Sequence, residues 1–371
     1  MMKFSCEKAL LQNAINVASR TVAQKSSIPA LEGLLLQVDK DLTISGYNMQ
    51  TGIRTKVSAD VVSGGEMVLN ARLFGDIIRK MPDDIIVFTA DEKLMVHLSC
   101  GDADFDILGL AATDYPELPI VEDDYGFAIQ QRTLRDMIEQ TSFAVSTNES
   151  RPVHTGALFE IADSGLTMVA VDGFRLAYRK EPMERIMGGA FSFVAPGSAL
   201  NEVQKICEDS EDIAEVTLGR RHVMFAIGDT ELICRRLEGE FLDYRNAIPR
   251  KNPIAVMVET RALINSIDRV SVVINDKLKS PVRCIFDHDK VMLSAKTGNG
   301  EAKDICLIHG DGQGLEIGFN NRYLIDALRY APADAVRIEL NTGVSPAIIV
   351  PVDGQDNFLY MVLPVRLKAA D

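Results

Sequence analysis

Five histidines and six cysteines are the side chains of this 371-residue chain most able to act as nucleophiles or metal ligands. The histidines are His97, His154, His222, His288 and His309, and no pair of them has the spacing of a metal site. The cysteines are Cys6, Cys100, Cys207, Cys234, Cys284 and Cys306. They contain no C-x-x-C pair, which indicates buried reduced thiols and neither a disulfide framework nor a zinc site. We therefore expect no metal and no cofactor.

The segment GDADFDI places Asp102, Asp104 and Asp106 at alternate positions, as at the start of a calcium-binding loop. That loop requires glycine at its sixth position, which Ile107 occupies here. The alternation predicts a strand whose acids face solvent, with Phe105 and Ile107 on the other face. That other face can be ordinary core, or it can belong to a sheet edge that pairs with another chain.

Motifs of bond-making chemistry are missing from the sequence. The cluster GDGQG at Gly310 precedes a strand and does not join a strand to a helix, which argues against a phosphate-binding loop. No G-x-x-x-x-G-K-[ST], H-E-x-x-H or G-x-S-x-G sequence occurs. An enzyme would need a catalytic constellation that the sequence does not contain, so we expect no catalytic activity.

Two segments set apolar side chains around an arginine next to a turn-forming residue. They are VDGFRLAYRK, at 171–180, and the closing YMVLPVRL, at 360–367. One interpretation is a tight turn and an edge strand. The other is an apolar groove with polar anchors that binds a short peptide.

The chain repeats itself. GLLLQV begins at Gly33, GALFEI at Gly156 and RCIFDH at Arg283, at separations of 123 and 127 residues, and a second short strand follows each. Each separation is roughly the length of an ordinary domain. The sequence therefore predicts three similar domains, at 1–125, 126–251 and 252–371. In each domain a unit made of a strand, a helix and then several strands occurs twice.

Helical periodicity predicts six helices, at 7–20, 71–80, 131–142, 198–208, 260–273 and 320–331. The strands outnumber them and are joined mostly by short turns. Such a pattern favours the α+β class, with antiparallel sheets and helices on one face. A doubly wound parallel sheet would need a helix after nearly every strand.

Charge is distributed unevenly. The whole chain carries −14, yet the six helical windows hold twelve Lys and Arg against eight Asp and Glu. Amphipathic surface helices are often basic, but six equivalent helices share this bias here. If the repeat places all six on the same side of the protein, that side is basic and could surround a polyanion. No apolar run of 18 residues and no secretory leader is present, so we expect a cytoplasmic protein.

Several segments together resemble the bacterial sliding clamp, the beta subunit of DNA polymerase III. They are MKFSCEKALLQNAINVASR, IPALEGLLLQV, TGALFE, TMVAVDGFRLA, EGEFLDYRNAIP, IGFNNRYLIDAL and the closing LPVRL. The resemblance covers essentially the whole chain. It implies three domains of the DNA clamp fold, each built from two βαβββ units. It also implies a head-to-tail ring of two chains, with the sheets outside and the helices lining a hole for duplex DNA.

The resemblance also implies site residues. The peptide-binding groove corresponds to His154, Val171, Gly173, Phe174, Arg175, Leu176, Leu242, Asn246, Ala247, Asn320, Tyr323, Val344, Pro346, Met361, Leu363, Pro364, Val365, Arg366 and Leu367. The positions that contact DNA correspond to Lys25, Arg72, Arg79, Lys80, Lys205 and Arg283. The dimer interface corresponds to Phe105 and Ile107 against Val272 and Val273.

The chain departs from the usual family pattern at several of these positions. His154 replaces an apolar residue, Phe174 a histidine and Asn246 an arginine, while Gly197 and Ser198 stand where a basic pair is common. By resemblance, the partners are double-stranded DNA of any sequence and, through short peptide motifs, the replicative polymerase, the clamp loader and repair proteins. The alternative is a structural repeat protein that assembles without DNA.

Overall fold

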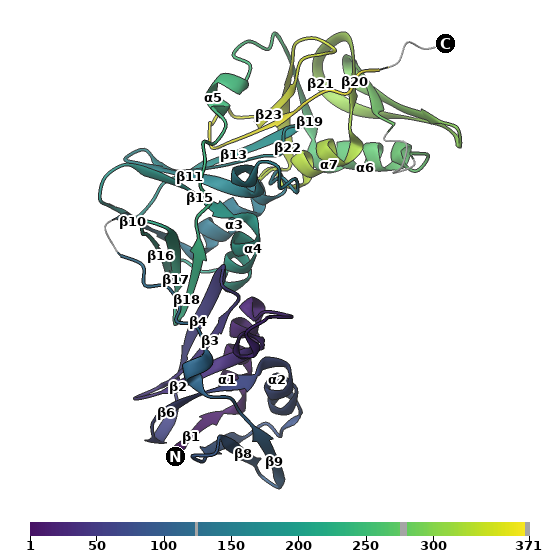
Figure 1. The fold of residues 1–371 in the computed structure, drawn as a ribbon. Helices are drawn as coiled ribbons and strands as arrows, with labels where there is room; N and C mark the ends of the chain where they lie inside the picture. Colours follow the sequence, from purple (N-terminus) through teal and green to yellow (C-terminus); the bar gives the residue numbers. More distant parts are fainter. Residues whose placement is uncertain (123–124, 275–279, 368–371) are drawn as a thin grey trace. The chain divides into compact units, whose positions relative to one another are not determined.

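A computed structural model describes residues 1–122, 125–274 and 280–367 (Figure 1). The chain divides into two compact units. The first comprises Met1–Arg135, Met183–Gly189 and Ser198–Arg236. The second comprises Asp136–Pro182, Ala190–Gly197 and Leu237–Asp371.

The first unit contains two antiparallel sheets. The smaller has the strand order β5 (Asp60–Ser63), β1 (Met2–Glu7), β7 (Ile85–Ala90), β8 (Met95–Cys100), β9 (Ala103–Leu108). The larger has the order β14 (Arg185–Met187), β10 (Tyr125–Gln130), β16 (Ile213–Leu218), β17 (His222–Ile227), β18 (Thr230–Arg235), β4 (Thr51–Val57), β3 (Leu42–Tyr47), β2 (Gly33–Val38), β6 (Gly65–Asn70). The larger sheet therefore joins strands of the first and second predicted domains.

The second unit contains one antiparallel sheet. Its order is β15 (Phe191–Pro196), β11 (Gly156–Ala162), β12 (Gly165–Val171), β13 (Arg175–Glu181), β24 (Phe358–Val362), β23 (Ala347–Pro351), β22 (Ala335–Leu340), β19 (Ile254–Glu259), β21 (Gly300–Phe319), β20 (Val282–Thr297). It joins strands of the second and third predicted domains through β13 and β24. The α+β class with antiparallel sheets is thus confirmed.

The six expected helices are present, with ends within a few residues of the predictions. They are α1 (Lys8–Ala18), α2 (Ala71–Lys80), α3 (Gln131–Ser142), α4 (Gly197–Ile206), α6 (Thr260–Ser271) and α7 (Asn321–Arg329). Within these bounds they hold eleven Lys and Arg against six Asp and Glu, so the positive balance persists. No described helix is long and apolar enough to span a lipid bilayer.

One short helix, α5 (Tyr244–Ala247), was not expected. None of the six helices predicted from the sequence lies there. The side chain of Asp243 accepts a hydrogen bond from the amide of Asn246 and so caps this single helical turn.

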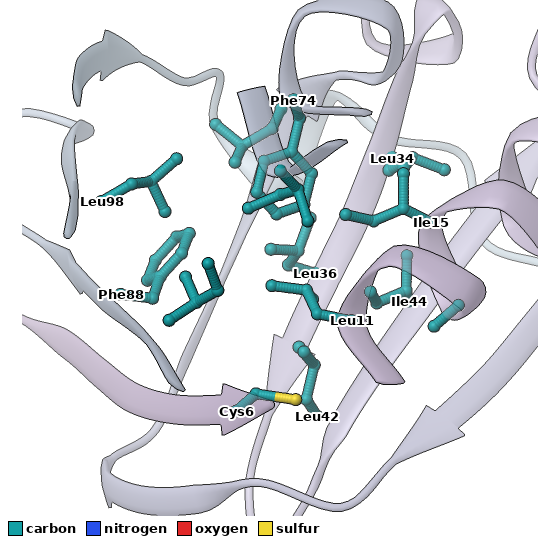
Figure 2. Close-up of a cluster of buried hydrophobic side chains, with 14 of the residues drawn as sticks. Cys6, Leu11, Ile15, Leu34, Leu36, Leu42, Ile44, Phe74, Phe88 and Leu98 are labelled. Atoms are coloured by element: carbon teal, nitrogen blue, oxygen red, sulfur yellow. The ribbon is translucent and has the colours of Figure 1, made fainter. Parts of the chain in front are cut away.

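Helix spacing and strand alternation explain the core of the first predicted domain (Figure 2). Leu11 and Ile15, four residues apart on α1, point to the same side of that helix and are buried. They belong to a cluster with Phe74 of α2 and with alternate residues of the strands. Phe4 and Phe88 stack across β1 and β7 with ring centroids 4.6 Å apart.

The segment GDADFDI begins with the turn residues Gly101 and Asp102 and continues as strand β9, as expected, and not as a calcium-binding loop. Asp104 and Asp106 are exposed as expected, whereas Ile107 packs against the core cluster and Phe105 remains 37% exposed. The expectation for GDGQG was wrong, because it lies inside β21 and not before a strand. Gly310 and Gly314 take φ values of 120° and 69° there, which a side chain would strain.

Candidate functional sites

The second unit contains a hollow of about 520 Å³ beside the β12–β13 turn. Ten of the residues predicted for the groove line it: His154, Val171, Gly173, Phe174, Arg175, Leu176, Leu242, Ala247, Met361 and Leu363. Apolar side chains such as Leu176, Met361 and Leu363 line it together with polar groups. A cavity of this size and character suits a few side chains of an extended peptide.

Asp172 organises the turn that opens this hollow. Its Oδ1 accepts hydrogen bonds from the amides of Phe174 and Arg175, at 2.9 and 3.0 Å. Gly173, between Asp172 and Phe174, has a φ of 89°, a left-handed conformation that favours glycine. The turn therefore fixes where β13 begins, and with it the direction of the next side chains into the hollow.

Arg175 connects that turn to helix α7. Its guanidinium donates to Asp172 at 2.9 Å and to Asp326 at 2.6 Å. It also lies over the rings of Phe143 and Tyr323, at 5.3 and 4.6 Å from their centroids. With 12% of its side chain exposed, Arg175 acts chiefly as a structural link that holds the turn against α7.

Phe174 and Tyr323 form an aromatic pair at the rim. Their rings stack with centroids 5.9 Å apart, and Phe174 is 58% exposed. Asn320 positions Tyr323 by capping α7, since its Oδ1 accepts from the amides of Arg322 and Tyr323 at 3.0 and 3.3 Å. Asn320 thus supports the pair without lining the hollow.

A hydrophobic cluster lies beneath the hollow. Val171, Leu176 and Met361 are buried and belong to it together with Tyr244. The hydroxyl of Tyr244 donates to Glu160 at 2.5 Å, and burial followed by this hydrogen bond raises the pKa of the phenol. The anchored phenol keeps α5, and so the adjoining Ala247, in place at the edge of the hollow.

His154 lines the hollow with an imidazole ring that is uncharged at neutral pH. Burial, followed by the nearby charge of Arg151, lowers the pKa of its imidazole. The ring meets that of Phe241 edge to face at 5.4 Å. An imidazole held in this way replaces an apolar side chain without adding a charge to the hollow.

The C-terminal segment runs along the rim. The amide of Leu363 donates to the carbonyl of Phe174 at 2.9 Å, and that of Val365 donates to the carbonyl of Gly318 at 2.8 Å. Leu367 packs so closely on Gly318 that a Cβ there would lie 2.6 Å from the leucine Cδ2. These contacts fix the tail beside the hollow although β24 has already ended.

Nine predicted groove residues do not line the hollow itself. They are Asn246, Asn320, Tyr323, Val344, Pro346, Pro364, Val365, Arg366 and Leu367. Sequence reasoning in turn missed five lining residues: Ser146, Asn148, Ser150, Arg151 and Asp172. Four of these lie in the polar STNESR segment after α3, whose cluster of Ser and Asn was a signal for a loop.

Two shallow hollows of the first unit are each lined by one basic residue. Arg72, at the start of α2, lines one of about 590 Å³, and Lys25 lines another of about 680 Å³. The loop residues Val22, Ala23 and Gln24 line both. Sequence reasoning missed the neutral amides of Gln24, Asn48 and Gln50 at these hollows.

Some of the predicted DNA-contacting cations already have acidic partners. Arg79 pairs with Asp76 one turn earlier on α2. Lys205 lies 2.7 Å from Glu202, whose carboxylate is also 3.6 Å from Arg20. Arg283 differs from the others because it lies on strand β20, where it pairs with Glu316.

The four residues predicted for a dimer interface lie on two separate elements. Phe105 and Ile107 share the face of β9 that is opposite to its aspartates. Val272 and Val273 follow the end of α6, where Val272 is 83% exposed and the carbonyl of Val273 accepts a hydrogen bond from Thr297.

Comparison with family models identifies three consecutive matches along this chain. Residues 2–119 match the N-terminal domain of the DNA polymerase III beta subunit, 128–243 its central domain and 245–366 its C-terminal domain. These matches span most of the chain. The resemblance found in the sequence is therefore confirmed.

Curated relatives agree over the full length. The beta sliding clamp of Halalkalibacterium halodurans is 30% identical, covering 98% of this chain and 100% of its own. That of Synechocystis is also 30% identical, over 99% of this chain and 100% of its own.

Solved structures agree in fold. A putative DNA polymerase III beta subunit from Eubacterium rectale superposes with a TM-score of 0.93 at 28% identity. The DNA polymerase sliding clamp from Bacillus subtilis does so with a TM-score of 0.93 at 26% identity. Each alignment covers 99% of this chain and 100% of the other.

Proposed function

This chain belongs to the DNA polymerase III beta subunit family, the bacterial sliding clamps, and we propose on that premise that two copies close head to tail into a ring around duplex DNA. The ring tethers the replicative polymerase and other partners, so that the polymerase does not leave the template between nucleotide additions. The full-length match of all three domains carries this proposal.

The DNA contact is electrostatic and independent of sequence. Helices with more Lys and Arg than Asp and Glu, on a chain of net charge −14, favour phosphate contact on one side and repulsion elsewhere. A closed ring is held topologically, so tight binding is unnecessary. The contacting side chains in this proposal are Lys25, Arg72, Arg79, Lys80, Lys205 and Arg283.

Partners dock in the hollow beside the β12–β13 turn. Val171, Leu176 and Met361 supply its apolar walls, and each anchor side chain buried there contributes on the order of 1.5 to 3 kcal/mol. A peptide with a Gln, followed by Leu and a terminal Leu or Phe, matches this lining. With one hollow per chain, a ring of two chains can hold two partners at once.

In this proposal the clamp has no catalytic activity of its own and acts in the cytoplasm, where replication proteins bind DNA. In this proposal, the domains run 1–125, 126–251 and 252–371. The dimer forms through Phe105 and Ile107 of one copy and Val272 and Val273 of the other.

Truncation after Val362 tests the tethering role. It removes Leu363, which lines the hollow, and the tail beyond it, but no residue assigned to the dimer interface. We expect calorimetry to show no binding of the peptide, and sedimentation to show an intact dimer. Unchanged peptide affinity after this truncation would refute the assignment of the groove.

A further inference from the structure

The turn that opens the hollow of the second unit has a counterpart in the first unit. At the turn between β3 and β4, Oδ1 of Asn48 accepts hydrogen bonds from the amides of Gln50 and Thr51, at 3.0 and 2.8 Å. Oδ1 of Asp172 accepts two such bonds at the β12–β13 turn. Met49, in the middle of the first turn, has a φ of 71°, and the middle residue of the second turn has a φ of 89°. The two turns therefore share one geometry.

The strands beside the two turns also correspond. Tyr47 lies opposite Gly52 across the first turn, at the end of the β3–β4 pairing. Val171 lies opposite Leu176 across the second turn, at the end of the β12–β13 pairing. Tyr47 is therefore the counterpart of Val171. By the same register, Gly52 is the counterpart of Leu176.

The neighbouring strand continues the correspondence. Strand β18 places Ile233 opposite Gly52. Strand β24 places Met361 opposite Leu176. Two residues further along the chain, an amide donates to the carbonyl of the third turn residue, at 3.0 Å in the first unit and 2.9 Å in the second. The sheet around the first turn is therefore built like the sheet around the hollow.

The loop that follows the first helix of each repeat makes the same backbone contact in both units. The amide of Ala23 donates to the carbonyl of Leu31 at 3.0 Å in the first unit. The amide of Ser146 donates to the carbonyl of His154 at 2.9 Å in the second unit. Leu31 is thus the counterpart of His154, which lines the hollow. In the first unit Leu31 is buried in an apolar cluster with Tyr47.

A segment with a buried tyrosine packs beside each turn. Tyr115 is 6% exposed and belongs to the same cluster as Tyr47. Tyr244 is 3% exposed and belongs to the cluster beneath the hollow. Each tyrosine follows an aspartate, and the third residue after it is Leu118 in one segment and Ala247 in the other. Leu118 is therefore the counterpart of Ala247.

The two units differ in what fills the space between these residues. In the second unit Ala247 is exposed, and it lines the hollow together with Leu176. In the first unit Leu118 packs against the apolar cluster. A Cβ built on Gly52 would lie 3.0 Å from Cδ2 of Leu118 and 3.1 Å from Cδ2 of Tyr47. The leucine and the tyrosine therefore fill the first unit at the place where the second unit is hollow.

A leucine in this place has the chemistry of a partner's anchor. The peptide proposed for the hollow presents a leucine, and Leu118 is a leucine that the chain itself supplies. Because the chain tethers Leu118 beside the cluster, its effective concentration there is on the order of millimolar or higher. A free partner at micromolar concentration does not displace it. Ala247 has no side-chain atom beyond Cβ, so the second unit stays open.

We propose that the first unit contains a closed counterpart of the peptide groove, in which Leu118 occupies the place of a partner's apolar anchor. The size of the residue at this repeat position, leucine at 118 and alanine at 247, decides which unit binds a partner. The inference rests on the peptide-binding role proposed above. It makes Ala247 the residue that keeps the groove open.

Filling the hollow tests the role of Ala247. Ala247→Leu introduces, at an exposed position, the side chain that closes the first unit, so the fold should remain intact. Calorimetry with the Gln- and Leu-containing peptide should show a rise of about tenfold or more in the dissociation constant, because the leucine anchor of the peptide loses its pocket. Ala255→Leu is the matched control, because Ala255 is exposed on β19 and does not line the hollow. Its dissociation constant should stay within about twofold of wild type.

Photo-cross-linking tests the role of Leu118. The peptide carries a diazirine analogue of leucine in place of its Leu, and proteolysis with mass spectrometry locates the label. In the wild-type chain the label should lie on residues that line the hollow of the second unit. Leu118→Ala should add label on β4 or on the 22–31 loop of the first unit. Ile120→Ala, in the same segment, is the matched control and should add none, since Ile120 is 92% exposed.

The outcomes separate this inference from the peptide-binding role. A wild-type chain that takes no label in the second unit overturns the peptide-binding role itself. Where the wild type is labelled there, an Ala247→Leu affinity within about twofold of wild type overturns the inference alone. Label on β4 of the wild type, or no label in the first unit of Leu118→Ala, also overturns it. Circular dichroism establishes that each variant is folded, and Ala247→Leu decides the inference if Leu118→Ala does not fold.

Discussion

Replacing Phe174 by alanine should weaken peptide binding with little effect on folding. Phe174 is 58% exposed at the rim of the hollow and stacks on Tyr323. A phenylalanine presents roughly 200 Å² of surface, so a peptide that covers half of the exposed part removes about 60 Å² from water. At about 25 cal/mol per Å² this is about 1.5 kcal/mol, or roughly a tenfold rise in the dissociation constant.

Isothermal calorimetry with the Gln- and Leu-containing peptide measures this change. The exposed position of Phe174 limits the loss of folding stability to about 1 kcal/mol or less. Phe191→Ala is the matched control, because Phe191 stacks on Phe193 at 6.3 Å and does not line the hollow. Phe174→Leu keeps apolar area and should lose less affinity. A Phe174→Ala dissociation constant within twofold of wild type would show that the peptide does not cover this ring.

The other predictions concern DNA contact and stability. Replacing Lys25, Arg72 and Lys205 by alanine should weaken binding equally on unrelated DNA sequences. The slope of the logarithm of the binding constant against the logarithm of the salt concentration should become shallower by about 0.9 per lost phosphate contact. In the same salt titration Arg283→Ala should have the smallest effect, because Arg283 lies on a strand and pairs with Glu316. Glu202→Gln should strengthen DNA binding, because its carboxylate contacts both Lys205 and Arg20, and an unchanged affinity would contradict that role. Tyr244→Phe should destabilise the fold by about 1.5 to 3 kcal/mol in urea denaturation, since it removes the hydrogen bond to Glu160. Burial raises the pKa of Tyr115, Tyr244 and Tyr360 above the ordinary value of 10.0. The protonated phenols therefore contribute fully to the free energy of unfolding below pH 10, and this contribution is lost as the pH rises beyond 10. Stability that does not fall between pH 9 and pH 11 would contradict this.

Periodicity alone was sufficient to predict most of the fold. The four-residue spacing of Leu11 and Ile15 gave the correct helix and the correct buried face. The alternation of β9 gave the correct strand, but only Ile107 on its apolar face packs against the core, and Phe105 is 37% exposed. Short α5 could not be found this way, because a single turn contains no period and depends on the Asp243 cap. The position of GDGQG was misjudged since its glycines bend a continuous strand without interrupting it.

The groove was predictable in part. Leu176 and Met361 lie on neighbouring strands that are distant in sequence. The residue pattern offered a groove formed by their two segments as one of two interpretations, and the resemblance to a family favoured it. The contact of Arg175 with Asp326, across 151 residues, has no local signature in the sequence. The polar segment 146–151 was overlooked because its Ser and Asn residues are typical of an ordinary loop. Its position beside the hollow depends on how the second unit folds.

Retention on DNA of different topology tests the central claim most directly. The chain is loaded onto a nicked circular duplex by a clamp loader with ATP and then washed at high salt, which removes proteins held only by phosphate contacts. The account predicts that the ring remains on the circle through the wash and is released when a restriction enzyme cuts the circle once. Loss from the intact circle at high salt, or retention on the linear product, would contradict a ring that encircles DNA.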